Sequence, residues 1–168
     1  MTTTDHAKQT FLDTYDREHA ITMKVLRAYP EDRLDLRPHP RCRTARELGW
    51  VFVLERGLGE MVFNNDFPEK ATGDTPEPPD SWQQALRMLE ESSARFRTMI
   101  ADTPPEELDQ KVRFFTAPKT LGEMKRIDWV WFLLHDEIHH RGQFSIYLRM
   151  ADGRVPSIYG PTADEEWM

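Results

Sequence analysis

Apolar residues recur every three or four positions in four stretches of the chain, which is the spacing of helices that bury one face. The first stretch runs from about Thr4 to Ala28, and the second ends near Val62. The third begins after Ser81 and stops before the proline pair at 104–105, and the fourth reaches about Met150. The pattern therefore predicts four amphipathic helices.

Three of the predicted helices start with a Ser or Thr followed three residues later by Glu or Gln, the capping-box pattern. The pairs are Thr44 with Glu47, Ser81 with Gln84, and Thr120 with Glu123. The last pair predicts that the fourth helix begins near residue 120. The preceding segment, 111–120, is predicted to be short and extended and to pack over one end of the bundle, and strand signals are otherwise nearly absent.

The segments between the predicted helices are rich in proline and glycine. Residues 29–43 contain three prolines and form a connector, residues 64–80 form a long polar loop, and residues 151–168 form an irregular tail. Four helices with one long connection predict an all-α protein, a four-helix bundle with one long crossover loop. The 168 residues are the size of one domain, so residues 1–168 are predicted to be a single helical bundle domain.

The composition argues against several classes of function. The formal net charge is -7, which disfavours binding to nucleic acid or to anionic membranes. The sequence contains no run of eighteen apolar residues, the length needed to span a membrane, and the first ten residues do not resemble a secretory signal. The single cysteine, Cys42, cannot form an internal disulfide, so we expect a cytoplasmic protein. Its neighbours Arg41 and Arg43 favour a thiolate, although a lone cysteine without a role is the simpler interpretation.

Half of the six histidines lie in HDEIHHRGQF, residues 135–144. His135 and His139 are one helical turn apart, so both rings can point at one metal ion. The apolar residues Trp131 and Ile146 on the same face predict that this pair points into the bundle. The alternative is a pair of core histidines that bond to each other, to Tyr15 or to buried water.

The remaining polar residues of this stretch are expected on the outer face or behind the ligands. His140 is predicted to pair with Asp136, one turn earlier, and Glu137 with Arg141. The spacing matches neither H-E-x-x-H nor H-x-x-E-H, so a metalloprotease is disfavoured.

Residues 135–150, HDEIHHRGQFSIYLRM, resemble the fourth helix of the DinB-like (DinB/YfiT) superfamily. The connector and second helix of that family resemble LDLRPHPRCRTARELGWVFVLE, and its C-terminal tail resembles GRVPSIYGPTADE. This resemblance implies a four-helix bundle that forms a homodimer. It also implies a divalent metal, nickel or zinc, held by three histidines, of which His135 and His139 match two. Relatives of this kind use low-molecular-weight thiols in transferase and isomerase reactions.

The third histidine of the family pattern is replaced by Val51, which cannot bind a metal. The site is therefore empty, or another residue substitutes, or the alignment is shifted. Glu55 is the preferred substitute, ahead of Glu47 and of His19, which is expected to bond to Tyr15. Two functions follow: a metal-dependent thiol S-transferase or hydrolase with ligands His135, His139 and Glu55, or a metal-free bundle that binds a small apolar ligand or serves as a structural dimer.

Overall fold

The structure is a computed structural model that describes residues 3–68 and 75–168. It contains four long helices and one small antiparallel sheet. The helices are α1 (Thr3–Arg27), α2 (Ala45–Phe63), α3 (Trp82–Asp102) and α4 (Arg126–Met150). Two short 3₁₀ turns, η1 (Glu31–Arg33) and η2 (Pro105–Asp109), and strands β1 (Lys111–Ala117) and β2 (Thr120–Lys125) complete the order. The all-α bundle prediction is confirmed.

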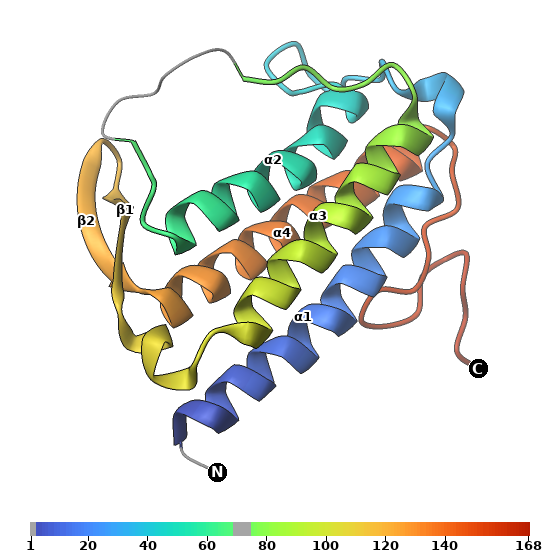
Figure 1. Ribbon diagram of the computed structural model, residues 1–168. Coiled ribbons are helices and arrows are strands. Elements are labelled where there is room, and N and C mark those ends of the chain that lie inside the picture. Colours follow the sequence, from blue (N-terminus) through green and yellow to red (C-terminus); the bar gives the residue numbers. More distant parts are fainter. Residues whose placement is uncertain (1–2, 69–74) are drawn as a thin grey trace.

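The helices pack as a four-membered ring in which α1 contacts α3 and α4, and α2 also contacts α3 and α4. Figure 1 shows that α1 and α4 run in one direction and that α2 and α3 run in the other. Because the neighbours α2 and α3 are parallel, the chain must return along the whole bundle between them. A 21-residue helix is roughly 30 Å long, which explains the length of the segment after α2.

The sequence located the starts of two helices correctly. Thr44 caps α2, and its side chain accepts a hydrogen bond from the Glu47 N–H while the Glu47 carboxylate accepts one from the Thr44 N–H. Ser81 caps α3 by accepting a bond from the Gln84 N–H. These bonds satisfy donors that have no partner inside the helix.

The predicted start of the fourth helix at Thr120 is wrong. Residues 120–125 form β2, which pairs antiparallel with β1, and α4 begins at Arg126. The Thr120–Glu123 spacing imitates a cap, but the residues lie in a two-stranded ribbon instead. Phe114 packs its ring against Trp129 of α4, with ring centroids 4.5 Å apart, so the hairpin covers one end of the bundle.

The core consists of two apolar clusters, one toward each end of the bundle. One surrounds Phe144 and Trp82, whose rings stack, and the other surrounds Phe96 and Trp129. At Gly59, α2 approaches both Phe96 and Leu133 so closely that a Cβ atom would lie within 3 Å of each. Among the described helices, none is both long and apolar enough to cross a membrane.

Candidate metal centre

A layer of buried charged and polar side chains lies between the two apolar clusters. Arg56 of α2 and Glu137 of α4 are completely buried and form an ion pair, and the Thr22 hydroxyl donates to Glu137 at 2.6 Å. Arg56 also donates to Ser93 Oγ at 3.2 Å, and its guanidinium lies over the ring of Tyr15. This layer fixes the rotation of α2 and α4 about their own axes, because a buried charge without its partner is strongly destabilising.

Residues that lie next to Arg56 and Glu137 in the sequence form a second group, on the side of the same layer where α2 meets α4. Glu55 precedes Arg56, Asp136 precedes Glu137, and His140 follows Asp136 by one turn. One ligand atom from each of Glu55, Asp136 and His140 lies within 4.8 Å of the others. We call this group the acid–imidazole triad.

The triad is only partly open to solvent. The Nε2 atom of His140 lies 3.2 Å from Oε1 of Glu55 and 3.7 Å from Oδ1 of Asp136. The side chains are 7%, 39% and 14% exposed for Glu55, Asp136 and His140, so Asp136 forms the solvent side. The His140–Glu55 contact has the distance of an ion pair but not the angle of a hydrogen bond, and neither Glu55 oxygen has a hydrogen-bond partner among the described residues.

The electrostatics of the triad favour positive charge between its members. Burial raises the pKa of the Glu55 carboxyl, and the neighbouring His140 ring only partly offsets this effect. The Glu55 carboxylate in turn raises the pKa of the His140 ring, although partial burial opposes the shift. Glu55 and His140 therefore both bind protons more readily than isolated side chains do. Two acids and an imidazole this close together favour a positive charge between them, whether a proton or a cation.

Gln143 orients the imidazole of the triad. Its Oε1 atom lies 3.2 Å from Nδ1 of His140, and its Nε2 atom lies 2.9 Å from Nε2 of His139. An amide oxygen can only accept, so Nδ1 of His140 carries the hydrogen and the neutral ring presents the lone pair of Nε2 to Glu55 and Asp136. Such an outer hydrogen bond sets the tautomer of histidine ligands in metal sites.

The prediction that His135 and His139 point into the bundle is wrong, because both are exposed. They share the outer face of α4 with Phe132 and Ile146, which are 45% and 60% exposed. The structure does not bring either histidine to Glu55, and within the described ranges neither belongs to a group of three metal-ligand side chains.

The expected placement of Glu137 and Arg141 on the outer face, as a pair with each other, is also wrong. Both are buried, with Glu137 paired to Arg56 as described above. Arg141 instead donates to Glu18 at 2.8 Å and to the Tyr159 hydroxyl at 2.5 Å, and that hydroxyl donates to Glu18 at 2.5 Å. The predicted contact between His140 and Asp136 is confirmed, but it lies inside the triad.

The other proposed third donors lie elsewhere. Glu47 serves as the cap partner of Thr44. His19 stacks on the ring of Tyr15 with centroids 6.2 Å apart, and the expected hydrogen bond between them is wrong because the Tyr15 hydroxyl donates to the Ser93 carbonyl at 3.3 Å. Glu55 is the one predicted donor that joins the triad, while Asp136 and His140 were not predicted as candidate ligands although their one-turn spacing is visible in the sequence.

A helical bundle with a carboxylate–imidazole group between two of its helices is the class that the fold and the site define. The model of the DinB superfamily matches residues 14–144, and the chain belongs to this family. The chain is similar to YrdA of Bacillus subtilis (strain 168), an uncharacterized protein, with 27% identity over 98% of this chain and 92% of that protein.

Solved structures of DinB-like proteins share the fold. A DinB-like protein from Bacillus cereus ATCC 10987 superposes with a TM-score of 0.75 and 22% identity over 90% of this chain and 97% of the other. The DinB-like protein YjoA from Bacillus subtilis gives a TM-score of 0.66 at 14% identity over 89% and 97% of the two chains. At these identities the likeness supports the architecture and not a shared activity.

Proposed function

We propose that the protein is a divalent-cation-dependent enzyme whose cation is held by Glu55, Asp136 and His140. The observation that supports this proposal is Glu55, a buried carboxylate with two oxygens that have no hydrogen-bond partner in the described chain. A buried charge in this state is costly unless it coordinates a cation or is otherwise paired. It faces a second carboxylate and an imidazole nitrogen whose lone pair points the same way.

The donor set fits a divalent cation. Two carboxylates and one imidazole suit zinc, manganese or iron, and they are harder donors than the three histidines on which the expectation of nickel or zinc was based. Zinc is common to both sets. Three protein ligands leave an open coordination position, which is the arrangement of catalytic sites and not of structural ones.

The reaction class follows from the exposed side of the triad. Bound there, a divalent cation supplies Lewis-acid chemistry that lowers the pKa of a coordinated water or thiol. Asp136 is the most exposed member of the triad, and the carboxylate oxygen that does not hold the cation would accept the proton of the nucleophile. Gln143 holds the His140 ring in its orientation. We infer hydrolysis or transfer to a low-molecular-weight thiol as the two reactions that these groups can support.

The test is turnover by protein purified without an affinity tag and depleted of metal. Hydrolysis of a panel of activated esters and conjugation of glutathione to an electrophile are measured with and without added zinc or manganese. We expect cation-dependent turnover in one panel, lost in Asp136→Asn and kept in Asp128→Asn, which changes an acid of the same helix outside the triad. Turnover that is indifferent to the cation, or equal in both variants, would contradict the proposal.

Self-association is a second proposal, supported by a different observation. The outer face of α4 exposes Phe132, Ile146 and Met150, with His135 and His139 between them. Phe132 and Met150 are placed symmetrically about residue 141, so two antiparallel α4 helices can pair Phe132 of one copy with Met150 of the other around a two-fold axis. Light scattering should give the mass of a dimer, and Ile146→Glu should give a monomer. A monomeric wild type would contradict this proposal.

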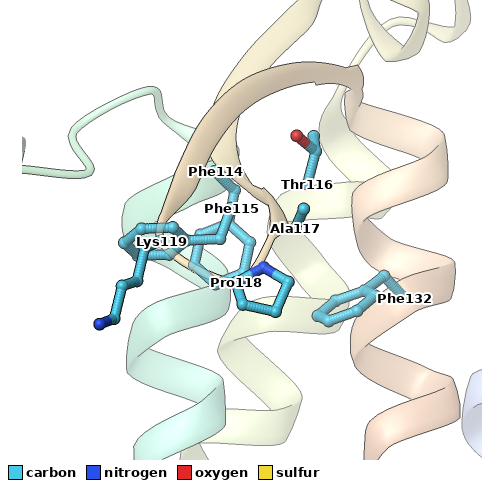
Figure 2. Close-up of a pocket in the computed structure, with 7 residues that line it drawn as sticks. All are labelled: Phe114, Phe115, Thr116, Ala117, Pro118, Lys119 and Phe132. Atoms are coloured by element: carbon cyan, nitrogen blue, oxygen red, sulfur yellow. The ribbon is translucent and has the colours of Figure 1, made fainter.

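The surface has two apolar hollows on other parts of the bundle, one at the hairpin turn and one along α2. Figure 2 shows the one at the hairpin turn, where Phe115 and Pro118 face Phe132 across an apolar hollow of about 430 Å³. A wider cleft of about 790 Å³ runs along the outer side of α2 between Trp50 and Met61, with Glu55 in its wall. Its apolar lining is the surface that a small apolar ligand would occupy.

A further inference from the structure

Five arginines are concentrated in residues 33–46, which comprise most of the connector between α1 and α2 and the first two residues of α2, in a chain of net charge -7. Three of them have partners. Arg33 lies 3.6 Å from Asp152, Arg37 lies 3.4 Å from Glu47, and Arg46 donates to the carbonyls of residues 79 and 80. The guanidinium groups of the other two, Arg41 and Arg43, have no hydrogen-bond or ion-pair partner in the part of the chain that the structure describes.

These two arginines line a cavity of about 690 Å³ between the connector and the C-terminal half of α4. Cys42, Gln143 and Tyr147 also line it, and none of its described lining residues is acidic. The two arginines also border a neighbouring hollow whose wall contains Glu47 and Glu77. Arg43 contributes to a lowered pKa of Glu47, but only as a minor influence beside the Thr44 cap. The cavity therefore presents two guanidinium groups that form no ion pair within the described residues, on a protein that is acidic overall.

The backbone that carries the arginines is fixed before any ligand binds. The Cys42 N–H donates to the His39 carbonyl at 2.8 Å, and the Arg41 N–H donates to Nδ1 of His39 at 3.1 Å. The buried Tyr147 hydroxyl donates to the Arg43 carbonyl at 2.9 Å, which ties the connector to α4. A fixed backbone at these two positions reduces the entropy that is lost when their side chains bind an oxyanion.

Gln143 connects the wall of this cavity with the triad. This residue lines the cavity and also accepts the hydrogen bond from His140. Gln143 and Tyr147 follow His140 by three and seven residues, so they lie roughly 5 Å and roughly 10 Å farther along the axis of α4. A small molecule of a few carbon atoms spans this interval.

We infer that this cavity is the subsite for the anionic group, a carboxylate or a phosphate, of the small molecule whose reacting end lies at the triad. Arg41 and Arg43 bind the anion, and Gln143 lies between the anion and the reacting end. The role as a substrate subsite rests on the proposed function, whereas the binding of an anion between the two arginines does not.

Cys42 gives a direct test of anion binding because it is the single cysteine and lies in the cavity wall. Its alkylation by the neutral reagent iodoacetamide is followed by mass spectrometry at constant ionic strength, with increasing succinate or inorganic phosphate. We expect saturable protection, with the rate falling at least threefold. The stronger of the two anions distinguishes a carboxylate subsite from a phosphate subsite. Absence of saturable protection by both anions would overturn the inference.

Two variants separate the cavity from general charge effects. Arg41→Gln/Arg43→Gln should lose the protection, whereas Arg87→Gln/Lys111→Gln, which removes two exposed charges from α3 and β1, should keep it. Circular dichroism checks that each variant is folded. Protection that persists in the first variant, or that survives in urea, would show that the anion does not bind between these arginines, and the inference would fail.

The link to the triad is tested with cobalt-loaded protein and two thiols, mercaptosuccinate and uncharged 2-mercaptoethanol. Thiolate binding to cobalt gives a charge-transfer absorption band. Two guanidinium groups about 6 Å from the carboxylates favour the charged thiol by roughly tenfold at low salt, and this preference should vanish in Arg41→Gln/Arg43→Gln. Equal affinities in wild type would overturn the subsite role. Protection of Cys42 without any cobalt binding would instead contradict the proposed function and leave the anion site standing.

Discussion

Replacing Glu55 with leucine asks whether this acid is present for folding or for function. Both carboxylate oxygens are buried and have no hydrogen-bond partner within the described residues. An unpaired buried polar group costs about 1–3 kcal/mol of folding free energy, and the 3.2 Å contact with His140 returns about 1 kcal/mol. We therefore expect the cation-free Glu55→Leu protein to equal or exceed wild type in stability, by up to about 2 kcal/mol.

Glu137→Leu is the matched control, one helix away and in the same layer. Its carboxylate accepts hydrogen bonds from Arg56 and Thr22, so leucine there leaves a buried guanidinium without its counterion. This loss costs about 3–5 kcal/mol. In a chain of this length each kcal/mol moves the melting temperature by roughly 2–4 °C, so Glu137→Leu should melt well below both wild type and Glu55→Leu.

The assay is urea unfolding followed by circular dichroism, with a chelator present and then with zinc. Zinc at a hundred times its dissociation constant should stabilise wild type by about 2.7 kcal/mol and leave Glu55→Leu unchanged. If Glu55→Leu destabilises the cation-free protein as much as Glu137→Leu does, Glu55 is a structural acid and the reasoning is refuted.

Two further predictions concern packing and the C-terminal tail. Gly59→Ala should destabilise the fold by about 1–3 kcal/mol because its Cβ meets core side chains. Gly57 has open space around it, so Gly57→Ala should stabilise the fold by up to about 1 kcal/mol. Urea unfolding measures both changes in stability. The Arg149 guanidinium lowers the pKa of Asp164, so this carboxylate supports the tail above its unfolded pKa of about 3.9 and loses that role as the pH falls through its lower folded pKa. In wild type, the indole N–H resonance of Trp167 should then shift below about pH 4. In Asp164→Asn it should already be shifted at neutral pH. A resonance that is unchanged under both conditions would contradict the role of this ion pair.

The sequence was informative where local rules decide the structure. The helical period and the caps at Thr44 and Ser81 correctly located three helices and the starts of α2 and α3. The hairpin was missed because Thr120 and Glu123 imitate a cap, whereas pairing with β1 depends on contacts between Phe114 and Trp129 that no local pattern contains.

On α4, the sequence predicted the wrong face to point into the bundle. α4 carries apolar residues all around its circumference, so Trp131 and Ile146 favoured an inward histidine pair although Ile146 is exposed. The face of α4 that points into the bundle is set by Glu137 and Arg141. Their partners, Arg56 and Glu18, lie on other helices. Such pairing is a property of the packed bundle, and it rotates His140 toward Glu55.

The central claim is tested most directly by the number of zinc ions bound per chain in protein purified without an affinity tag, measured by calorimetry and elemental analysis. We expect one ion per chain in wild type and in His135→Ala/His139→Ala, and none in Glu55→Gln/His140→Ala. His135 and His139 remain the competing ligands. Loss of the ion from the His135/His139 variant, with binding retained in the triad variant, would contradict the account.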